Sequence, residues 1–330
     1  MQLTLPTRLY SDPSTYGLER ERVFAAGWQF LGRETDLAAP GDYIAGEIAG
    51  YPLLAVRGAD GEIRAFHNVC RHRAGPLVDD GTGSCGKELT CRYHGWRYAL
   101  DGRLRSAVGF GTLEGFDPRE FGLHPAAVKT WRGFVFVNPD GKAAPLGELI
   151  APLETLFAER DIRMAPAVTR RSHDIACNWK TYVENYLEGY HIGPIHPELA
   201  AEIEVEDYQV TMHGEVAVHD VPTKSGANNG LWAWLWPNLA INVFRYGLMV
   251  EHMKPMGPHR TRLDYLYFHE AGDDMAAILE ASDQLTNQDK DICEAVQRNL
   301  DAGVYRTGVL SPRHEGAVGW FQNRIAGLVA

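Results

Sequence analysis

Two short segments of the chain each carry one thiol and one imidazole, the side chains that bind soft and borderline metal ions. Cys70 and His72 form the first pair, and Cys91 and His94 form the second. One zinc ion could use all four, but paired zinc ligands are usually separated by two to four residues, whereas one residue separates Cys70 from His72. Two thiolates and two imidazoles suit a [2Fe–2S] cluster in which both histidines bind the same iron. The spacing therefore favours an iron–sulfur centre over a zinc ribbon or unrelated core residues.

A second dense group of polar residues lies between Asn178 and His196. Glu188 and His191 are three residues apart, so on a helix they share a face. His191 and His196 are five apart and would diverge on an unbroken helix, but Gly193-Pro194 between them ends or distorts it. The chain can then bend His196 back towards His191. Two imidazoles and one carboxylate, with open positions opposite them, form the facial triad of non-haem iron(II) oxygenases.

The carboxylate of this triad has to come from elsewhere in the chain. Our candidate is Asp291, which precedes an apolar stripe of Ile292, Ala295 and Val296 in a long predicted helix; Asp289 is the second choice and Glu294 the third. Taken alone, a carboxylate near a helix end is usually a solvated cap or a partner of the helix dipole. A histidine pair at this spacing is also more often structural. The metal hypothesis depends on finding both groups in one chain.

The elements that must position these residues fall into two kinds. Short runs bounded by Gly and Asp, such as the turns at Asp60-Gly61 and Asp101-Gly102, predict an antiparallel β module over residues 28–140. Both Cys/His pairs fall in its loops, where a rigid scaffold can present a metal site. Residues 141–330 mix helices with antiparallel strands, and residues 1–27 form an N-terminal helical segment. The predicted fold class is therefore α+β.

The later part has its own predicted order of elements. Helices are expected at 146–158, 179–192 and 273–301, and strands at 168–178, 207–221, 231–236, 239–253 and 260–270. Trp232, Trp234 and Trp236 alternate along one strand and so share a face. They could form an aromatic cage for a cation, but such a row is more often core packing. His219 and Trp320 are weaker candidates for the border of the same pocket.

Composition narrows the partners and the compartment. The formal charge of −11 argues against a nucleic-acid partner, which would require a basic face. The first ten residues lack a basic region followed by an apolar run, and the most apolar stretch, 231–250, is broken by polar residues and Pro237. We therefore expect neither a secretory signal nor a membrane span. Outside the two pairs, Cys85, Cys177 and Cys293 are an odd remainder without framework spacing, which fits a reducing cytoplasm.

Taken together, these motifs resemble the large (α) subunit of the Rieske non-haem iron oxygenases, the ring-hydroxylating oxygenase family. The flanking Arg73-Ala74-Gly75 and Gly95-Trp96-Arg97-Tyr98 strengthen the match at the cluster. At the iron the matching residues are Asn178-Trp179-Lys180, Glu184-Asn185-Tyr186, Tyr190-His191 and His196-Pro197.

The resemblance implies a role for each candidate residue. Cys70, His72, Cys91 and His94 would hold the cluster, and His191, His196 and Asp291 would hold the mononuclear iron. Asn185 would lie near the open iron positions. Glu188 would connect one subunit's cluster to its neighbour's iron in a head-to-tail homotrimer, because the two sites of one chain lie in different domains.

The resemblance also implies an activity. Such a terminal oxygenase uses O2 and electrons from a separate NAD(P)H-dependent reductase, sometimes through a ferredoxin, to hydroxylate a small organic substrate. No Gly-x-Gly-x-x-Gly fingerprint follows a strand here, so the reductase must be another chain. Many family members have an aspartate at the bridging place with one more residue before it. The glutamate and shorter spacing here are similar to members acting on quaternary amines, and favour N-methyl monooxygenation over aromatic cis-dihydroxylation. A Rieske electron carrier without oxygenase activity is the remaining alternative.

Overall fold

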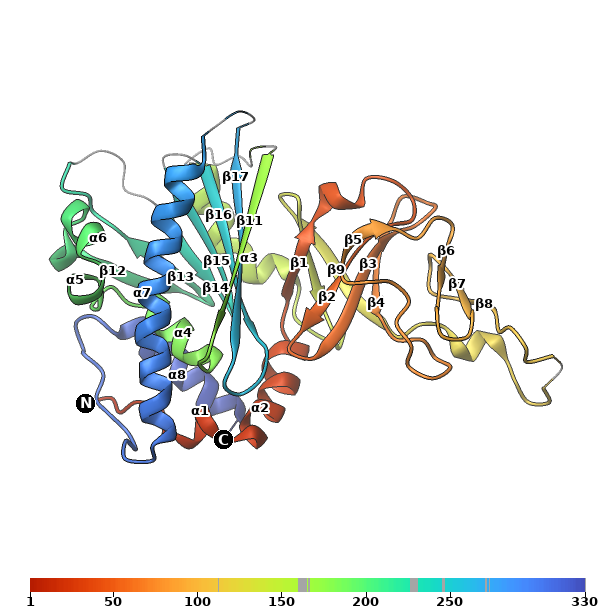
Figure 1. Ribbon diagram of the computed structural model, residues 1–330, viewed down its shortest axis with the longest axis horizontal. Coiled ribbons are helices and arrows are strands. Elements are labelled where there is room, and N and C mark those ends of the chain that lie inside the picture. Colours follow the sequence, from red (N-terminus) through yellow and green to blue (C-terminus); the bar gives the residue numbers. More distant parts are fainter. Residues whose placement is uncertain are drawn as a thin grey trace. The chain divides into compact units, whose positions relative to one another are not determined.

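The chain folds into two compact units. The computed structural model describes residues 1–111, 113–159, 165, 167–225, 231–244, 247–270, 272 and 274–329. The smaller unit is Arg20–Leu146, and the larger unit combines Met1–Glu19 with Gly147–Ala330. The N-terminal segment, expected to stand alone to residue 27, is thus divided between the two units. Figure 1 labels the elements of both.

The smaller unit is built on antiparallel strands, as the turn spacing predicts. A seven-stranded sheet has the order β1-β10-β9-β4-β3-β2-β5, and a three-stranded sheet has the order β6-β7-β8. The strands are β1 Gln29–Arg33, β2 Asp42–Ile48, β3 Tyr51–Arg57, β4 Ile63–His67, β5 Gly81–Ser84, β6 Glu88–Thr90, β7 Arg97–Ala99, β8 Leu104–Ser106, β9 Pro125–Trp131 and β10 Phe134–Asn138. Short helical segments are η1 Arg20–Ala25, η2 Glu34–Leu37 and η3 Pro118–Phe121.

The larger unit is a seven-stranded antiparallel sheet with helices, in the order β11-β17-β16-β15-β14-β13-β12. Its strands are β11 Ala167–Ile175, β12 Gln209–His213, β13 Val216–Asp220, β14 Leu231–Leu235, β15 Leu239–Phe244, β16 Gly247–Pro255 and β17 Thr261–His269. Its helices are α1 Arg8–Ser11, α2 Pro13–Glu19, α3 Leu146–Glu159, α4 Trp179–Tyr186, α5 Ile192–Ile195, α6 Pro197–Glu202, η4 Val205–Asp207, α7 Ala276–Asp301 and α8 Gly316–Val329. The α+β prediction is confirmed.

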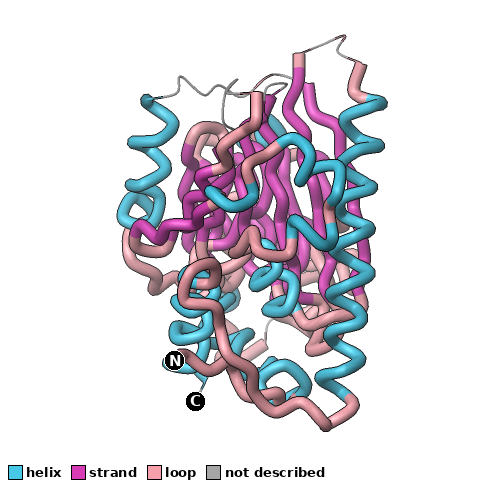
Figure 2. Tube along the Cα trace, turned by 90° about the vertical axis from the view of Figure 1, so that its left-hand side faces the viewer, coloured by secondary structure: helices cyan, strands magenta, loops and turns pink. Residues whose placement is uncertain are grey.

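The long helix α7 runs along one face of this sheet, and α4 lies between them (Figure 2). Asn178 caps α4: its side chain accepts a hydrogen bond from the Lys180 amide at 3.0 Å and donates to the carbonyls of Tyr10 and Pro258. These bonds satisfy an amide that a helix start leaves free. They also tie α4 to two other segments. The start of α4 is thereby fixed against the sheet.

Some predicted boundaries differ from the structure for identifiable reasons. The expected strand 207–221 is a hairpin, because Gly214 adopts a φ of +65° and turns the chain between β12 and β13. The expected helix 179–192 ends at Tyr186, so His191 lies beyond α4. The expected strand 239–253 is two strands, β15 followed by β16, and residues 245–246 between them lie outside the described part. The helix expected at 273–301 is α7, and residue 273 also lies outside the described part.

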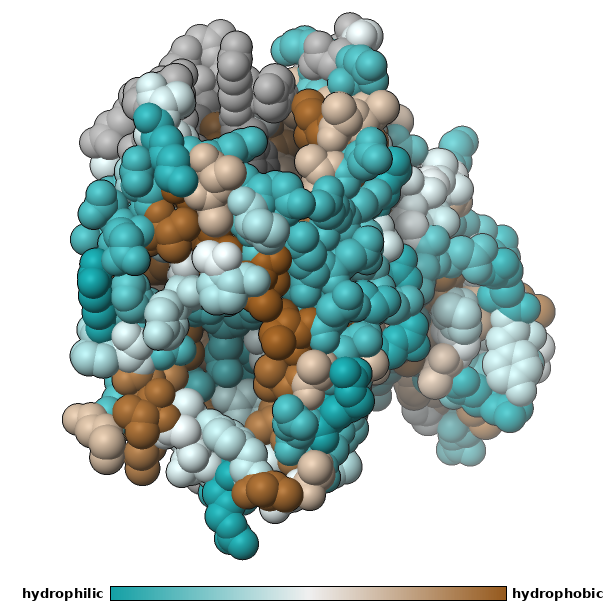
Figure 3. Space-filling view, turned by 60° about the vertical axis from the view of Figure 1, so that its left-hand side comes forward, coloured by the Kyte–Doolittle hydropathy of each residue, from teal (hydrophilic) through white to brown (hydrophobic). Residues whose placement is uncertain are grey.

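The surface of the larger unit gives two further observations. On the face turned forward in Figure 3, hydrophobic residues gather around a hollow within a mostly hydrophilic surface. Among the described helices, none combines the length and apolarity that a membrane crossing requires.

Candidate metal centres

The two Cys/His loops of the smaller unit have the same backbone geometry. Cys70 follows β4, donates its amide to the Gly75 carbonyl at 2.9 Å, and accepts from the Ala74 amide at 3.0 Å. Cys91 follows β6 and repeats the pattern with the Trp96 carbonyl at 2.8 Å and the Gly95 amide at 2.9 Å. Ala74 and Gly95 take positive φ values of 56° and 71° to close these turns. Two like loops therefore present one thiol each, as the ligand spacing predicts.

The potential ligand atoms of these loops are unsatisfied without a metal. The thiols of Cys70 and Cys91 are free and buried. The Nδ1 atoms of His72 and His94 are buried and have no hydrogen-bond partner among the described residues, and their rings lie 4.5 Å apart. A buried polar atom without a partner costs about 1–3 kcal/mol. Ligation of both Nδ1 atoms would remove this cost, so the residues fit a bound metal group.

The arrangement favours a two-iron cluster over one zinc ion. The ligands of a tetrahedral ion lie roughly 3–4 Å from one another. No three of these four ligand atoms, all within the described residues, gather inside 4.8 Å of one another. A [2Fe–2S] cluster separates its sulfur-bound iron from its nitrogen-bound iron. The open spacing is therefore the one that such a cluster needs.

A largely apolar layer surrounds the cluster loops. Trp96 is buried and stacks on His72, with ring centroids 5.0 Å apart and an interplanar angle of 8°. Phe110 packs edge-on against both rings. The Tyr98 hydroxyl contacts Cys70 Sγ at 3.1 Å and accepts from the Arg71 amide at 3.0 Å. Such a shell limits solvent access to a cluster and tunes its potential.

Gly75 provides a test of this packing. A Cβ added there would lie 2.8 Å from Cys91 Sγ and 3.1 Å from Tyr93 Cβ. We expect Gly75→Ala to push Cys91 out of place and to lower the acid-labile sulfide and the visible absorption per chain at least about twofold. Gly46→Ala, at a position in β2 where an added Cβ has no neighbour within 4 Å, is the matched control. Equal sulfide content in both variants would contradict the proposed role of this contact.

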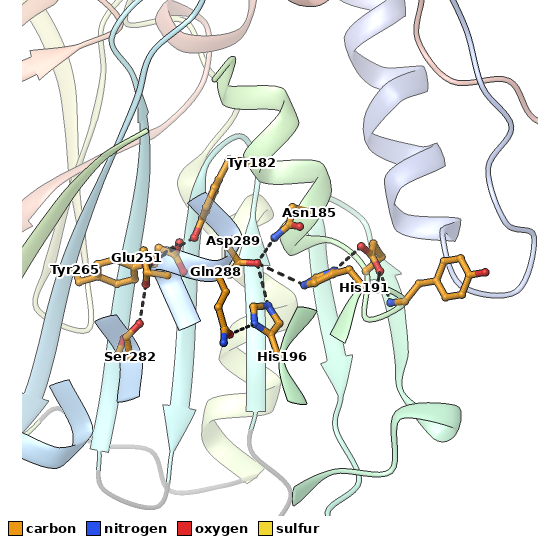
Figure 4. Close-up of polar contacts among 12 residues, drawn as sticks. Tyr182, Asn185, His191, His196, Glu251, Tyr265, Ser282, Gln288 and Asp289 are labelled. Carbon is orange, nitrogen blue, oxygen red and sulfur yellow. Dashed lines mark hydrogen bonds and ion pairs between the residues drawn. The ribbon is translucent and has the colours of Figure 1, made fainter. Parts of the chain in front are cut away.

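A second group of ligands lies in the larger unit, where His191, His196 and Asp289 converge (Figure 4). Asp289 Oδ1 lies 3.0 Å from His196 Nε2 and 3.7 Å from His191 Nε2. One ligand atom from each residue falls within 4.8 Å of the others, so all three can bind one ion. Two imidazoles and one carboxylate are the donor set of the facial triad. The residues fit a mononuclear iron.

The backbone around α5 brings the two histidines together. His191 precedes this single turn of helix and His196 follows it, at the start of α6, where Pro197 occupies the first helical position. The break predicted at Gly193-Pro194 lies earlier in the chain: α4 ends at Tyr186, and Gly193-Pro194 are part of the helical turn α5. The two rings lie 5.2 Å apart at 76°. Their Nε2 atoms therefore face the same carboxylate.

The remaining ring nitrogens are held by neighbouring side chains. His191 Nδ1 lies 2.6 Å from Glu188 Oε1, and His196 Nδ1 lies 2.6 Å from Gln288 Oε1. Each Nδ1–H donates to an oxygen, which leaves each Nε2 lone pair free for a metal. Although burial opposes a charged imidazole, Asp289 and Gln288 raise the pKa of His196 above its ordinary value. The site therefore favours positive charge.

The structure places Asp289, the second choice, beside the two histidines and does not place Asp291 there. Asp291 is exposed and lines a separate groove with Arg171 and Asp283, while Glu294 accepts a hydrogen bond from the Ala176 amide at 3.0 Å. Two residues turn a helix by about 200°, so Asp289 and Asp291 face opposite sides. The face of α7 turned to the core carries Thr286, Cys293, Gln297 and Leu300. Asp289 continues that stripe, whereas Val296 of the assumed stripe is exposed.

Two further residues contact the ligands. The Asn185 amide donates to Asp289 Oδ1 at 2.8 Å, so it lies at the site as expected. Gln288 was not anticipated from the sequence, although its position beside Asp289 was the available signal. Behind Asp289, Glu251 is buried and accepts from the Tyr265 hydroxyl at 3.1 Å (Figure 4). Burial raises the pKa of Glu251 to about 7.

The alternating tryptophans belong mainly to the core. Trp234 and Trp236 are buried, and each ring centroid lies 5.9 Å from that of Phe321 in α8. Trp320 packs on Trp236. Trp232 is partly buried and packs against an apolar cluster that includes Ile192, which follows His191 in the chain. Only Trp232 of this row is thus placed beside the site.

Comparison with known proteins agrees with both centres. The model of the Rieske [2Fe–2S] domain matches residues 27–117, and the model of the ring hydroxylating alpha subunit (catalytic domain) matches residues 164–226 and 202–330. The carnitine monooxygenase oxygenase subunit of Escherichia coli K12 is 32% identical, over 92% of this chain and 86% of its own length. The chloroplastic choline monooxygenase of Beta vulgaris is 32% identical, over 93% of this chain and 72% of its own length.

Solved structures show the same relationship. The quaternary ammonium Rieske monooxygenase CntA in complex with L-carnitine superposes with a TM-score of 0.87 and 29% identity, over 99% of this chain and 96% of that one. Naphthalene 1,2-dioxygenase with bound indole has a TM-score of 0.79 and 20% identity, over 99% of this chain and 92% of that one. This likeness shows that the two proteins share a fold. The chain therefore belongs to the Rieske-type ring-hydroxylating oxygenases, iron enzymes that combine a [2Fe–2S] cluster with a mononuclear non-haem iron.

Proposed function

We propose that this oxygenase hydroxylates an N-methyl group, or a neighbouring aliphatic C–H bond, of a small quaternary ammonium compound. The observation that carries the proposal is the likeness over nearly the whole chain to enzymes named for carnitine and choline. Glu188, at its shorter spacing, supports the same substrate class. Trp232 and Tyr208, which pack together beside Ile192, supply the aromatic faces that attract such cations.

We infer that His191, His196 and Asp289 hold the mononuclear iron, and that Cys70, His72, Cys91 and His94 hold the cluster. When bound, the iron activates O2 and the cluster supplies electrons one at a time. Glu188 and Gln288 keep the imidazoles in the tautomer that presents Nε2. Asn185 orients Asp289 by its hydrogen bond. The three side chains would hold the ion from one side and leave its remaining positions open.

The overall reaction balances with a separate reductase as the electron source. One O2, two electrons and two protons give one water and one hydroxylated N-methyl group. The resulting carbinol gives up its hydroxyl proton to water and releases formaldehyde as the C–N bond breaks, and the nitrogen keeps that electron pair as a tertiary amine. Because both electrons start on NAD(P)H in another chain, the reductase and any ferredoxin must dock on this oxygenase.

We further infer a head-to-tail homotrimer, in which Glu188 links the iron of its own chain to a neighbour's cluster. Glu188 Oε1 already accepts from His191 Nδ1 at 2.6 Å, and Oε2 accepts from the backbone amides of Tyr190 and His191. A carboxylate has about four acceptor positions, so one remains for a cluster imidazole. A heterologous contact that closes gives a ring. We also infer a cytoplasmic location, which the five free cysteines support.

The substrate proposal is tested with iron-loaded oxygenase, a surrogate reductase and NADH. Carnitine, choline, glycine betaine and proline betaine are compared with benzoate and naphthalene, and formaldehyde and cis-diols are quantified. We expect formaldehyde in near one-to-one ratio with NADH for at least one quaternary amine, and no diol. A cis-diol from an arene without formaldehyde from any amine would replace N-methyl hydroxylation by ring dihydroxylation. If the protein accepted electrons from the reductase but hydroxylated none of these compounds, the result would favour an electron carrier without oxygenase activity.

A further inference from the structure

A cavity lies in the larger unit beside α4. It has a volume of about 1030 Å³ and is bounded by α1, α4, the C-terminal part of α7, the segment after α7, and α8. Thr181 and Glu184 of α4 line it, whereas Asn185 of the same helix contacts Asp289. Glu184 and Asn185 are neighbours on this helix and point about 100° apart, so α4 contributes side chains both to the cavity and to the iron ligands.

The inner end of this cavity carries a carboxyl group without a cationic partner. Glu184 Oε1 accepts from the Tyr10 hydroxyl at 2.7 Å, and Gln322 Nε2 donates to the same hydroxyl at 3.3 Å. The nearby Lys180 ammonium is fully buried. It forms an ion pair with Glu19 and donates a hydrogen bond to Asn178 Oδ1 at 2.8 Å. Neutral groups thus make the hydrogen bonds of Glu184, and the described residues give it no ion pair. A buried carboxylate in such surroundings attracts a cation.

Apolar side chains line another part of the cavity, next to the polar Asn299 and Thr307. Val296 and Val304 line it and are 39% and 87% exposed, and Leu300 lies between them in sequence on the buried stripe of α7. Arg306 also lines the cavity, but it is exposed, so water and salt screen its charge. A ligand that complements this surface has a cationic hydrogen-bond donor at one end and a short hydrocarbon body at the other.

We propose that this cavity is a second binding site, separate from the iron, for a small organic amine. Its ammonium group donates to Glu184, and its alkyl body lies against Val296, Leu300 and Val304. A primary or secondary ammonium suits the site better than a quaternary one, because only the former has an N–H to donate. The site is joined to the active site through α4 and α7, which carry residues of both.

Proton linkage gives the site a characteristic pH dependence. Burial raises the pKa of Glu184 to about 7. Tyr10, Lys180, Cys293, Tyr305, Arg306 and Glu315 are the other titratable or charged groups around it. An alkylammonium with a pKa near that of lysine, about 10.4, stays charged from pH 6 to 8.5. Amine affinity should therefore rise over this range as Glu184 loses its proton, and binding at pH 6 should release a proton.

The test is calorimetric titration of the iron-loaded enzyme with n-butylamine at pH 7.5, with 1-butanol as the uncharged probe. We expect n-butylamine to bind and 1-butanol to bind at least tenfold more weakly. Glu184→Gln should lower the n-butylamine affinity at least tenfold and remove its pH dependence. Val296→Trp fills part of the cavity and leaves Glu184 in place. It should lower the n-butylamine affinity at least tenfold at every pH. Glu280→Gln, an exposed carboxylate elsewhere on α7, is the matched control.

Binding that is equal in all four proteins belongs to another site, such as the iron centre, and would overturn the proposal. So would the absence of n-butylamine binding to the wild-type enzyme. If Glu184→Gln fails to fold, Val296→Trp alone decides. Because the readout is heat of binding and not turnover, a negative result here leaves the substrate proposal untouched.

Discussion

Replacing Asp289 by alanine is expected to lower the iron content from three to two atoms per chain and to abolish substrate hydroxylation. Asp289 Oδ1 faces both Nε2 atoms, at 3.0 and 3.7 Å, and Asn185 orients it. Without this carboxylate two neutral imidazoles remain, which bind iron(II) weakly. Since the loss of a group that only supports a ligand already costs 10–100-fold, losing a ligand should cost about 100-fold or more in activity. Iron and acid-labile sulfide are measured on the same sample, so that the cluster serves as an internal standard.

Asp291→Ala is the matched control for this prediction. It removes an equal charge two residues away on the same helix, from an exposed position outside the ligand set. We expect three irons per chain and activity within about twofold of wild type, as for most surface substitutions. If Asp291→Ala lost the third iron while Asp289→Ala kept it, the ligand assignment would be reversed. Loss in neither variant would mean that the two histidines suffice.

The contrast between the two aspartates shows where sequence reasoning reached its limit. Cys70, His72, Cys91 and His94 could be paired from the sequence because each pair spans a single short loop. His191, His196 and Glu188 lie within nine residues of one another, so local turn chemistry sufficed. The third ligand comes from a helix almost one hundred residues later. Its choice depends on which face of α7 meets the sheet, and that is a property of tertiary packing.

The buried face of α7 explains in physical terms why Asp289 and not Asp291 lies beside the histidines. It carries Thr286, Cys293 and Gln297, whose polar atoms find partners inside the unit: Gln297 Oε1 accepts from the Asn178 amide at 2.9 Å, and Thr286 contacts Tyr265 at 3.1 Å. A hydropathy pattern alone, based on Ile292, Ala295 and Val296, therefore did not show which side of α7 meets the core. Polar residues that repeat every three or four positions can mark a core-facing stripe when they are fully hydrogen-bonded. The fold class did not depend on this detail and was predicted from turns and alternation.

The proposed cooperation between subunits gives the second large effect. We expect two inactive variants to restore activity when they assemble together. Cys91→Ser removes a cluster thiolate but leaves the iron ligands, and His191→Ala removes an iron ligand but leaves the cluster. Each homotrimer lacks one half of every electron path. In mixed trimers, a His191→Ala chain can pass an electron from its intact cluster to the intact iron of a neighbouring Cys91→Ser chain.

The arithmetic makes the outcome decisive. In a ring of three heterologous contacts formed from equal amounts of both chains, about one contact in four joins an intact cluster to an intact iron. The mixed preparation should therefore recover roughly a quarter of the wild-type rate per chain, against less than about 1% for either variant alone. Transfer within one chain would give no recovery, because every chain lacks one centre. Coexpression with two affinity tags isolates the mixed trimers for formaldehyde assays; in these one contact in three is productive, so the purified fraction should reach about a third of the wild-type rate.

Glu188 can be examined in the same mixed trimers, because only the chain that carries the working iron needs it. Glu188→Gln keeps an oxygen that can accept from His191 Nδ1, now at 2.6 Å from Glu188 Oε1, but removes the negative charge that binds a second donor. Added to the Cys91→Ser chain, it should abolish most of the recovered activity while the iron content stays unchanged. Added to the His191→Ala chain, where no iron depends on it, it should have little effect. Equal losses of activity in both positions would assign Glu188 to folding and not to the path between subunits. A structural role is needed in every chain, whereas a bridging role is needed only in the chain that receives the electron.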